Sequence, residues 1–141
     1  AAASEEIIDY LVNTSRPFIF ATALPPVLCA AALEALHIIE ESPALRYQLW
    51  QNIQKMHRRL KEAGFEIGPI TSPIFPVGIG SESDALKLSE ALLDQGILVP
   101  AVRYPTVPKG KARLRVTVSA THTEEEIEKL TNRLNWLRKN L

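Results

Sequence analysis

The residues best suited to chemistry lie in one basic segment in the last third of the chain. Arg113 and Arg115 alternate with the apolar residues Leu114 and Val116. This alternation is typical of a strand with one dry face and one polar face. A guanidinium binds a carboxylate or a phosphate through two parallel hydrogen bonds, which makes it more directional than lysine. We therefore predict an anion-binding surface, with a merely solvated strand face as the commoner alternative.

The loop before this strand favours anion binding. Pro105 and Pro108 restrict its backbone, because the proline ring fixes φ. Arg103 and Thr106 are held in this stiffened loop, which would lower the entropy lost when a ligand binds. We expect Arg103 and Thr106 to lie beside Arg115 on the same surface.

A second candidate is Thr22, which precedes the pair Pro25 and Pro26. Proline suits the first turn of a helix, so a helix is expected to begin here. A hydroxyl just before a helix N-terminus can join backbone N–H groups in holding a phosphate. The residues alone favour the alternative, in which Thr22 is a cap or a turn residue.

The remaining polar residues give no nucleophile and no acid–base pair. The three histidines, at positions 37, 57 and 122, lack the spacing of metal ligands. Cys29 is a single cysteine, which fits a reducing cytoplasm. The basic run around His57 is interpreted as a solvated helix face, with nucleic-acid binding as the less favoured alternative.

Composition predicts one soluble domain without a nucleic-acid or membrane partner. The chain has 141 residues, 46% of them hydrophobic, and 16 basic residues balance 16 acidic ones. A zero net charge gives no general attraction to nucleic acid or to an anionic membrane. No apolar run approaches the roughly 20 residues that span a bilayer. The first residues lack the pattern of a signal peptide, so we expect a cytoplasmic protein.

In the first part of the chain we expect a helix over residues 4–13, an extended piece at 18–20 and a helix ending near Glu41. Ser42 and Pro43 then begin a helix that Gly64 ends. Its apolar stripe is Leu45, Leu49, Ile53, Met56 and Leu60.

From residue 65 the apolar period shortens toward that of strands. Strands are predicted at 74–79, 97–99 and 113–119, with Pro76 at a sheet edge or a bulge. A helix is expected over 81–95, and a capping box at Thr123 and Glu126 begins the last helix. The stripe of that helix is Ile127, Leu130, Leu134, Leu137 and Leu141. The fold class is α+β: a small, mostly antiparallel sheet with helices on one face, preceded by helices.

Two segments carry a resemblance to a known family. They read RPFIFATALPP at residues 16–26 and AVRYPTVPKGKARLRVTVSATHT at residues 101–123. Together they resemble the α-oxoamine synthases, fold-type-I pyridoxal phosphate enzymes that condense an amino acid with an acyl-CoA and release carbon dioxide. The likeness implies pyridoxal phosphate as cofactor, a homodimer, and the substrates L-alanine and pimeloyl-CoA or a pimeloyl-carrier protein, as in biotin biosynthesis. The alternatives are another member, such as 2-amino-3-ketobutyrate CoA ligase, or a stand-alone small-molecule binding module.

The resemblance also implies roles for four residues. Arg115 matches the arginine that binds the amino-acid carboxylate, and Thr106 matches a threonine that contacts the substrate. Arg103 matches a loop arginine that helps to orient the substrate. Thr22 matches a hydroxyl that reaches the cofactor phosphate across the dimer interface. Two positions depart from the family pattern: Ala21 replaces a second hydroxyl, and Tyr104 replaces a common proline.

In this family, the lysine that carries the cofactor precedes the part that matches this chain. None of the lysines here stands in such a motif. We therefore expect the C-terminal third of such an enzyme, inactive in isolation. Residues 1–41 would be the helical tail of its large domain with the inter-domain helix, and residues 42–141 its small C-terminal α+β domain.

Overall fold

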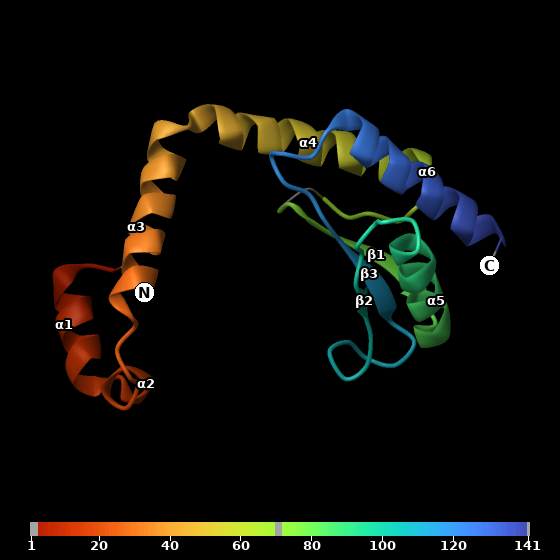
Figure 1. Cartoon of the computed structure of the whole chain (residues 1–141). Helices are drawn as coiled ribbons and strands as arrows, with labels where there is room; N and C mark the ends of the chain where they lie inside the picture. Colours follow the sequence, from red (N-terminus) through yellow and green to blue (C-terminus); the bar gives the residue numbers. More distant parts are fainter. Residues whose placement is uncertain (1–2, 70–71, 141) are drawn as a thin grey trace. The chain divides into compact units, whose positions relative to one another are not determined.

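The structure is a computed structural model that describes residues 3–69 and 72–140 (Figure 1). The chain divides into two compact units, residues 1–41 and residues 42–141. None of the helices that the structure describes is long and apolar enough to cross a membrane.

The first unit consists of three helices: α1 (Glu5–Thr14), α2 (Arg16–Ile19) and α3 (Pro26–Glu41). None of their residues is buried. The predicted helices at the start of the chain and after Pro25 are confirmed. Ser4 stands at the N-cap of α1, but its side chain makes no capping hydrogen bond.

The prediction of an extended piece at residues 18–20 is wrong, because this segment belongs to the turn of α2. The amides of Phe18 and Ile19 both donate to the carbonyl of Ser15, each at 3.0 Å. Pro17 lies in the first turn, where the missing N–H removes no helical hydrogen bond. A proline at position 17 is therefore compatible with the start of a new helical turn.

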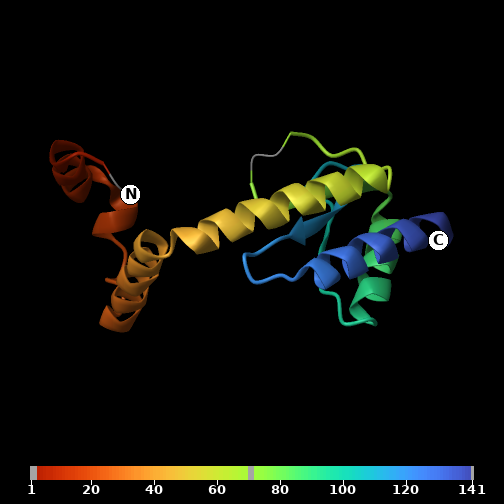
Figure 2. The same cartoon turned by 90° about the horizontal axis from the view of Figure 1, so that it is seen from above.

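The second unit is a three-stranded antiparallel sheet with helices packed on one face (Figure 2). The strands are β1 (Ile74–Gly80), β2 (Ala101–Val102) and β3 (Ala112–Thr117), in the order β1-β3-β2. The helices are α4 (Pro43–Glu62), α5 (Glu82–Leu93) and α6 (Glu124–Asn140). The predicted α+β class is confirmed.

One hydrophobic core joins the sheet to the three helices, because every second residue of β1 and β3 points into it. From the strands come Phe75, Val77, Leu114 and Val116. From the helices come Ile53, Met56, Leu60, Leu88, Leu92, Ile127, Leu130, Leu134 and Leu137. The predicted stripe of α4 is confirmed except at its start, since Leu45 is exposed. Leu141 lies outside the described residues.

Strand β3 occupies the centre of the sheet, so its neighbours fix where the arginines stand. Pro76 of β1 pairs with Arg115, and Val102 of β2 pairs with Arg113. Pro76 therefore lies on an edge strand, as predicted, and a register shift follows between Gly78 and Gly80. At an edge, the missing proline N–H costs no ladder hydrogen bond.

The predicted strand at residues 97–99 is wrong, since the pairing begins later, at Ala101. The carbonyl of Val99 accepts a hydrogen bond from the hydroxyl of Ser89 on α5, at 2.7 Å. The amide of Ile97 still donates to Leu92 at the end of α5. Ile97 and Val99 are thus hydrogen-bonded to α5, and the chain joins the sheet only from Ala101 onward.

Local signals set the other boundaries. Gly64 and Gly96 follow α4 and α5 with φ of +78° and +74°, a conformation that L side chains rarely adopt. At α6 the capping box is complete: the amide of Thr123 donates to Glu126 at 2.8 Å, and the amide of Glu126 donates to the Thr123 hydroxyl at 3.2 Å. The end of α4 at Gly64 and the capping box of α6 are confirmed, whereas α5 ends at Leu93, two residues before the predicted end.

The connector between β3 and α6 is fixed by a buried amide on α4. Asn52 is 1% exposed, and its side-chain nitrogen donates to the carbonyls of Ser119 and His122 at 3.0 and 2.8 Å. Gln48 donates to the Asn52 side-chain oxygen at 3.2 Å. Because buried polar groups are costly when unpaired, this network holds the end of β3 against α4.

Candidate functional site

The candidate site lies on the open face of the sheet, opposite the face that the helices cover. Along β3, Leu114 and Val116 are buried, Arg113 is partly exposed, and Arg115 is exposed. The predicted alternation is therefore present. No salt bridge involves Arg115 within residues 3–69 and 72–140, so its guanidinium is available to an anion from outside.

The hairpin loop between β2 and β3 carries Arg103 and Thr106, both exposed. The amides of Thr106 and Val107 donate to the carbonyl of Arg103 at 3.0 and 3.3 Å. The amide of Lys111 donates to Pro108 at 3.1 Å and closes a second turn. These bonds, with the two prolines, give the loop a defined backbone that presents both side chains to solvent.

The register places these residues in one hairpin but not at one point. Arg115 lies opposite Pro100, since its amide donates to the Pro100 carbonyl at 2.9 Å. Arg103 is three residues further along, which at the rise of a strand is about 10 Å. The surface on which Arg115, Arg103 and Thr106 were predicted to lie thus extends from the middle of the sheet to the β2–β3 loop. The roles of Arg115, Arg103 and Thr106 stay predictions.

Thr22 lies in the first unit, in an irregular segment before α3, with an exposed side chain. It is not the cap of α3, because it lies four positions before Pro26, the first residue of that helix. The amides of Leu28 and Cys29 both donate to Pro25, and Pro26 has no N–H. The first turn of α3 therefore leaves few donors for a phosphate, and a phosphate role for Thr22 would depend on its hydroxyl.

The basic run on α4 is paired with α6, which supports its interpretation as a helix face. Lys55 contacts Glu124 at 2.8 Å, and Arg59 contacts Glu128 at 3.4 Å. The hydrogen bond from Lys55 lowers the pKa of Glu124 below its ordinary value of 4.5.

The histidines and the cysteine do not gather into a centre. The ring of His122 accepts a hydrogen bond from the amide of Ser119 at 3.1 Å, and His57 lies 3.0 Å from the carbonyl of Gly68. In the part of the chain that the structure describes, no group of three or more His, Cys, Asp or Glu residues could hold a metal ion. Cys29 is exposed and free.

Sequence reasoning missed two features of the site. Asn52, which anchors the end of β3, stands at the helical spacing of the α4 stripe, three residues after Leu49 and four before Met56. A polar residue at this spacing was the available signal that Asn52 is buried. The register that places Pro76 beside Arg115 had no local signal, because it joins segments far apart in the chain.

Comparisons with known proteins identify the family. The family model described as "Aminotransferase class I and II" matches residues 1–134. The chain therefore belongs to the aminotransferase class I and II family.

Among curated relatives, the chain resembles proteins named 8-amino-7-oxononanoate synthase. One from Thermoanaerobacter pseudethanolicus is 45% identical over 127 residues, which are 90% of this chain and 32% of that protein. A putative 8-amino-7-oxononanoate synthase from Desulforudis audaxviator is 48% identical over 126 residues, 89% of this chain and 33% of its own length. The predicted resemblance is confirmed, and the chain spans about a third of the length of these relatives.

Solved structures agree with the sequence comparison. A serine palmitoyltransferase from S. paucimobilis with a bound PLP–myriocin aldimine has a TM-score of 0.88 at 28% identity, covering 99% of this chain and 35% of that one. An 8-amino-7-oxononanoate synthase from Francisella tularensis has a TM-score of 0.83 at 28% identity, covering 99% and 41%. The fold is thus that of a part of the pyridoxal phosphate enzymes of fold type I.

Proposed function

We propose that this chain is the substrate-clamping, C-terminal part of an 8-amino-7-oxononanoate synthase, the enzyme that joins L-alanine to a pimeloyl thioester with loss of carbon dioxide. The observation that carries the proposal is the exposed guanidinium of Arg115 on the central strand, which forms no salt bridge with any residue that the structure describes. The likeness to relatives of that name over 90% of the chain supports it.

In this proposal Arg115 binds the carboxylate of L-alanine through two parallel hydrogen bonds. Such a clamp fixes the orientation of the bond that must break, which is an entropic contribution to catalysis. Arg103 and Thr106, held by the turn of the hairpin loop, would contact the same substrate from the side.

Pyridoxal phosphate, when bound, supplies the electron sink for such chemistry. The chain offers groups of the right type: the hydroxyl of Thr22 would hold the cofactor phosphate, and the guanidinium of Arg115 would hold the substrate carboxylate. Residues 1–41 contain no lysine. The covalent attachment of the cofactor is therefore assigned to a lysine outside these residues. Thr22 is assigned to the cofactor phosphate. The assembly proposed is a cytoplasmic homodimer.

A graft tests the proposal. This chain would replace the matching segment of the relative from Thermoanaerobacter pseudethanolicus, and product formation from L-alanine and pimeloyl-CoA would be measured. The grafted enzyme should be active. Arg115→Ala should lower kcat/KM for alanine roughly a hundredfold or more, because hydrogen bonds to charged groups contribute about 1.5–3 kcal/mol each.

The matched control is Arg58→Ala, which removes an exposed guanidinium from α4, on the covered side of the sheet. It should leave kcat/KM unchanged. An active graft in which Arg115→Ala has no effect would contradict the clamp. A graft that turns over glycine or serine in place of alanine would favour another α-oxoamine synthase, such as 2-amino-3-ketobutyrate CoA ligase.

A further inference from the structure

The β2–β3 hairpin carries far more positive charge than a single carboxylate requires. Between Asp94 and Glu124 the sequence has no acidic residue, although the chain as a whole is balanced at 16 basic and 16 acidic residues. The basic residues of this interval are Arg103, Lys109, Lys111, Arg113 and Arg115. The imbalance is therefore local and belongs to one short hairpin.

These cations differ from those of the helices in lacking acidic partners. Lys55 and Arg59 of α4 form salt bridges with α6. Over the described ranges 3–69 and 72–140, no salt bridge involves a cation of the hairpin. Neighbouring like charges repel each other, and they create a positive potential that attracts anions. An anionic ligand would relieve that repulsion.

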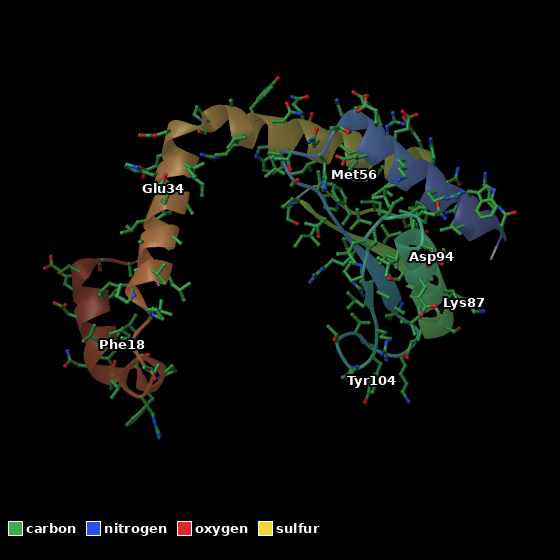
Figure 3. All side chains as sticks on the ribbon, viewed as in Figure 1. Phe18, Glu34, Met56, Lys87, Asp94 and Tyr104 are labelled. Carbon is green, nitrogen blue, oxygen red and sulfur yellow. The ribbon has the colours of Figure 1, made fainter. Side chains whose placement is uncertain are left out.

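The hairpin gives two of these cations, Arg113 and Lys109, a side-chain contact toward its loop. Arg113 donates from Nε to the carbonyl of Lys111 at 3.4 Å, so its side chain turns toward the loop. The ammonium of Lys109 lies 5.4 Å from the centre of the Tyr104 ring, within cation–π range. Figure 3 shows Tyr104 at the end of this loop.

Arg113, Lys111 and Lys109 extend away from Arg115. Two residues of a strand span about 7 Å, so Arg113 lies about that far from Arg115 along β3, and Lys111 and Lys109 lie further toward the loop. A ligand that reacts at the substrate held by Arg115 could therefore place a distant anionic end on this group. The arrangement is compact, confined to one loop, which suits a small polyanion better than the broad surface of a protein.

We propose that Lys109, Lys111 and Arg113 form a binding site for the phosphate groups of a small, multiply phosphorylated ligand. The identity of that ligand rests on the proposed function: it is the phosphate end of the acyl-CoA thioester, whose long pantetheine arm reaches back toward the substrate at Arg115. The hairpin thus holds the carboxylate of one substrate and the phosphates of the other.

Calorimetry on the 141-residue chain tests the site directly, with coenzyme A and unphosphorylated pantetheine as probes. Coenzyme A should bind, more weakly as salt is added because the screening length shrinks to about 8 Å at 0.15 M. Pantetheine should not bind. At low salt the double variant Lys109→Gln/Lys111→Gln should raise the Kd for coenzyme A about fivefold to tenfold, since exposed charge pairs contribute up to about 1 kcal/mol each.

The control is Lys61→Gln/Lys87→Gln, which removes the same charge from exposed positions on α4 and α5 and should leave the Kd unchanged. Equal binding of coenzyme A by both double variants would overturn the site. So would equal binding of pantetheine, or binding of an acidic acyl-carrier protein without binding of coenzyme A.

In the active graft, Lys109→Gln/Lys111→Gln should raise KM for pimeloyl-CoA and leave KM for alanine unchanged, whereas Arg115→Ala affects alanine. An inactive graft would count against the proposed function while the binding data still decided the phosphate site. An active graft with unchanged KM for pimeloyl-CoA would overturn the phosphate site alone.

Discussion

The two units of the chain contrast in what holds their helices in place. In residues 42–141, each helix buries an apolar stripe in a core shared with the sheet. In residues 1–41, none of the helical residues is buried, and large apolar side chains such as Phe18, Phe20 and Leu33 are exposed. Since helices in proteins owe most of their stability to packing, only the second unit stabilises its own geometry.

This contrast bears on function, because the proposed site residues are divided between the units. Arg103, Thr106 and Arg115 belong to a hairpin supported by a core, and their backbone is fixed within this chain. Thr22 belongs to a segment without such support. Exposed apolar surface on this scale marks an interaction surface. If the proposed roles hold, the carboxylate clamp is preformed within this chain, while the proposed phosphate contact of Thr22 needs further polypeptide.

The largest expected effect comes from a matched pair of leucines in helices. Leu60 on α4 is 0% exposed and Leu33 on α3 is 67% exposed. Leu60→Ala should lower the free energy of unfolding by about 2–5 kcal/mol, because it leaves a cavity. Leu33→Ala should change it by less than about 0.5 kcal/mol.

Urea unfolding followed by tryptophan fluorescence measures both changes, since Trp50 and Trp136 report on the second unit. An equal loss of stability in the two variants would break the contrast, because Leu33 would then have to be packed in the same cooperative structure.

A smaller effect is expected at the helix caps. Thr123→Ala removes the hydroxyl that accepts from the amide of Glu126 and should cost about 1 kcal/mol. Ser4→Ala removes a side chain that makes no capping bond, so α1 should be unchanged. Amide hydrogen exchange in the first turn of each helix measures the difference, and Thr123→Ser should restore protection. Faster exchange in α1 after Ser4→Ala would show that the two caps are alike.

The smallest effect concerns pH. The folded pKa of Glu124 lies below 4.5, so its pairing with Lys55 stabilises the folded state above that pH and loses this contribution as pH falls through the lowered pKa. Lys55→Met should return the pKa of Glu124 toward 4.5 and reduce the pH dependence of stability in that window, with Arg59 and Arg58 still lowering the pKa. Carboxyl NMR titration measures the pKa. Lys87→Met, at an exposed position on α5, is the control and should leave it unchanged.

Much of the second unit could be predicted from local sequence signals. A glycine with positive φ, a capping box or a proline in a first turn acts within a few residues, so the ends of α4, α5 and α6 followed from neighbours in the chain. The alternation in β3 likewise predicted which face each arginine takes. These signals were enough to indicate the α+β class and the polar face of β3 that carries the proposed anion-binding residues.

The errors arose where the outcome depends on partners far along the chain. The bonding of Val99 to α5 displaced the expected strand to Ala101, and no residue near Val99 signals this contact. Leu45 continues the stripe of α4 but reaches no core. The error at residues 18–20 has a local cause. Pro17 is compatible with the first turn of a helix that begins at Arg16, so the residues after it can be helical.

The sequence by itself determined the chemistry of the candidate site and the face of the strand that carries it. It placed the guanidinium groups of Arg113 and Arg115 on the polar side of a strand, beside a loop stiffened by proline. Only the tertiary structure decided what surrounds them. It placed β3 at the centre of the sheet, put Pro76 beside Arg115 and fixed the strand end through Asn52. The physical reason is that side-chain alternation is a property of one strand, whereas register and anchoring are properties of pairs of segments that meet only in the folded chain.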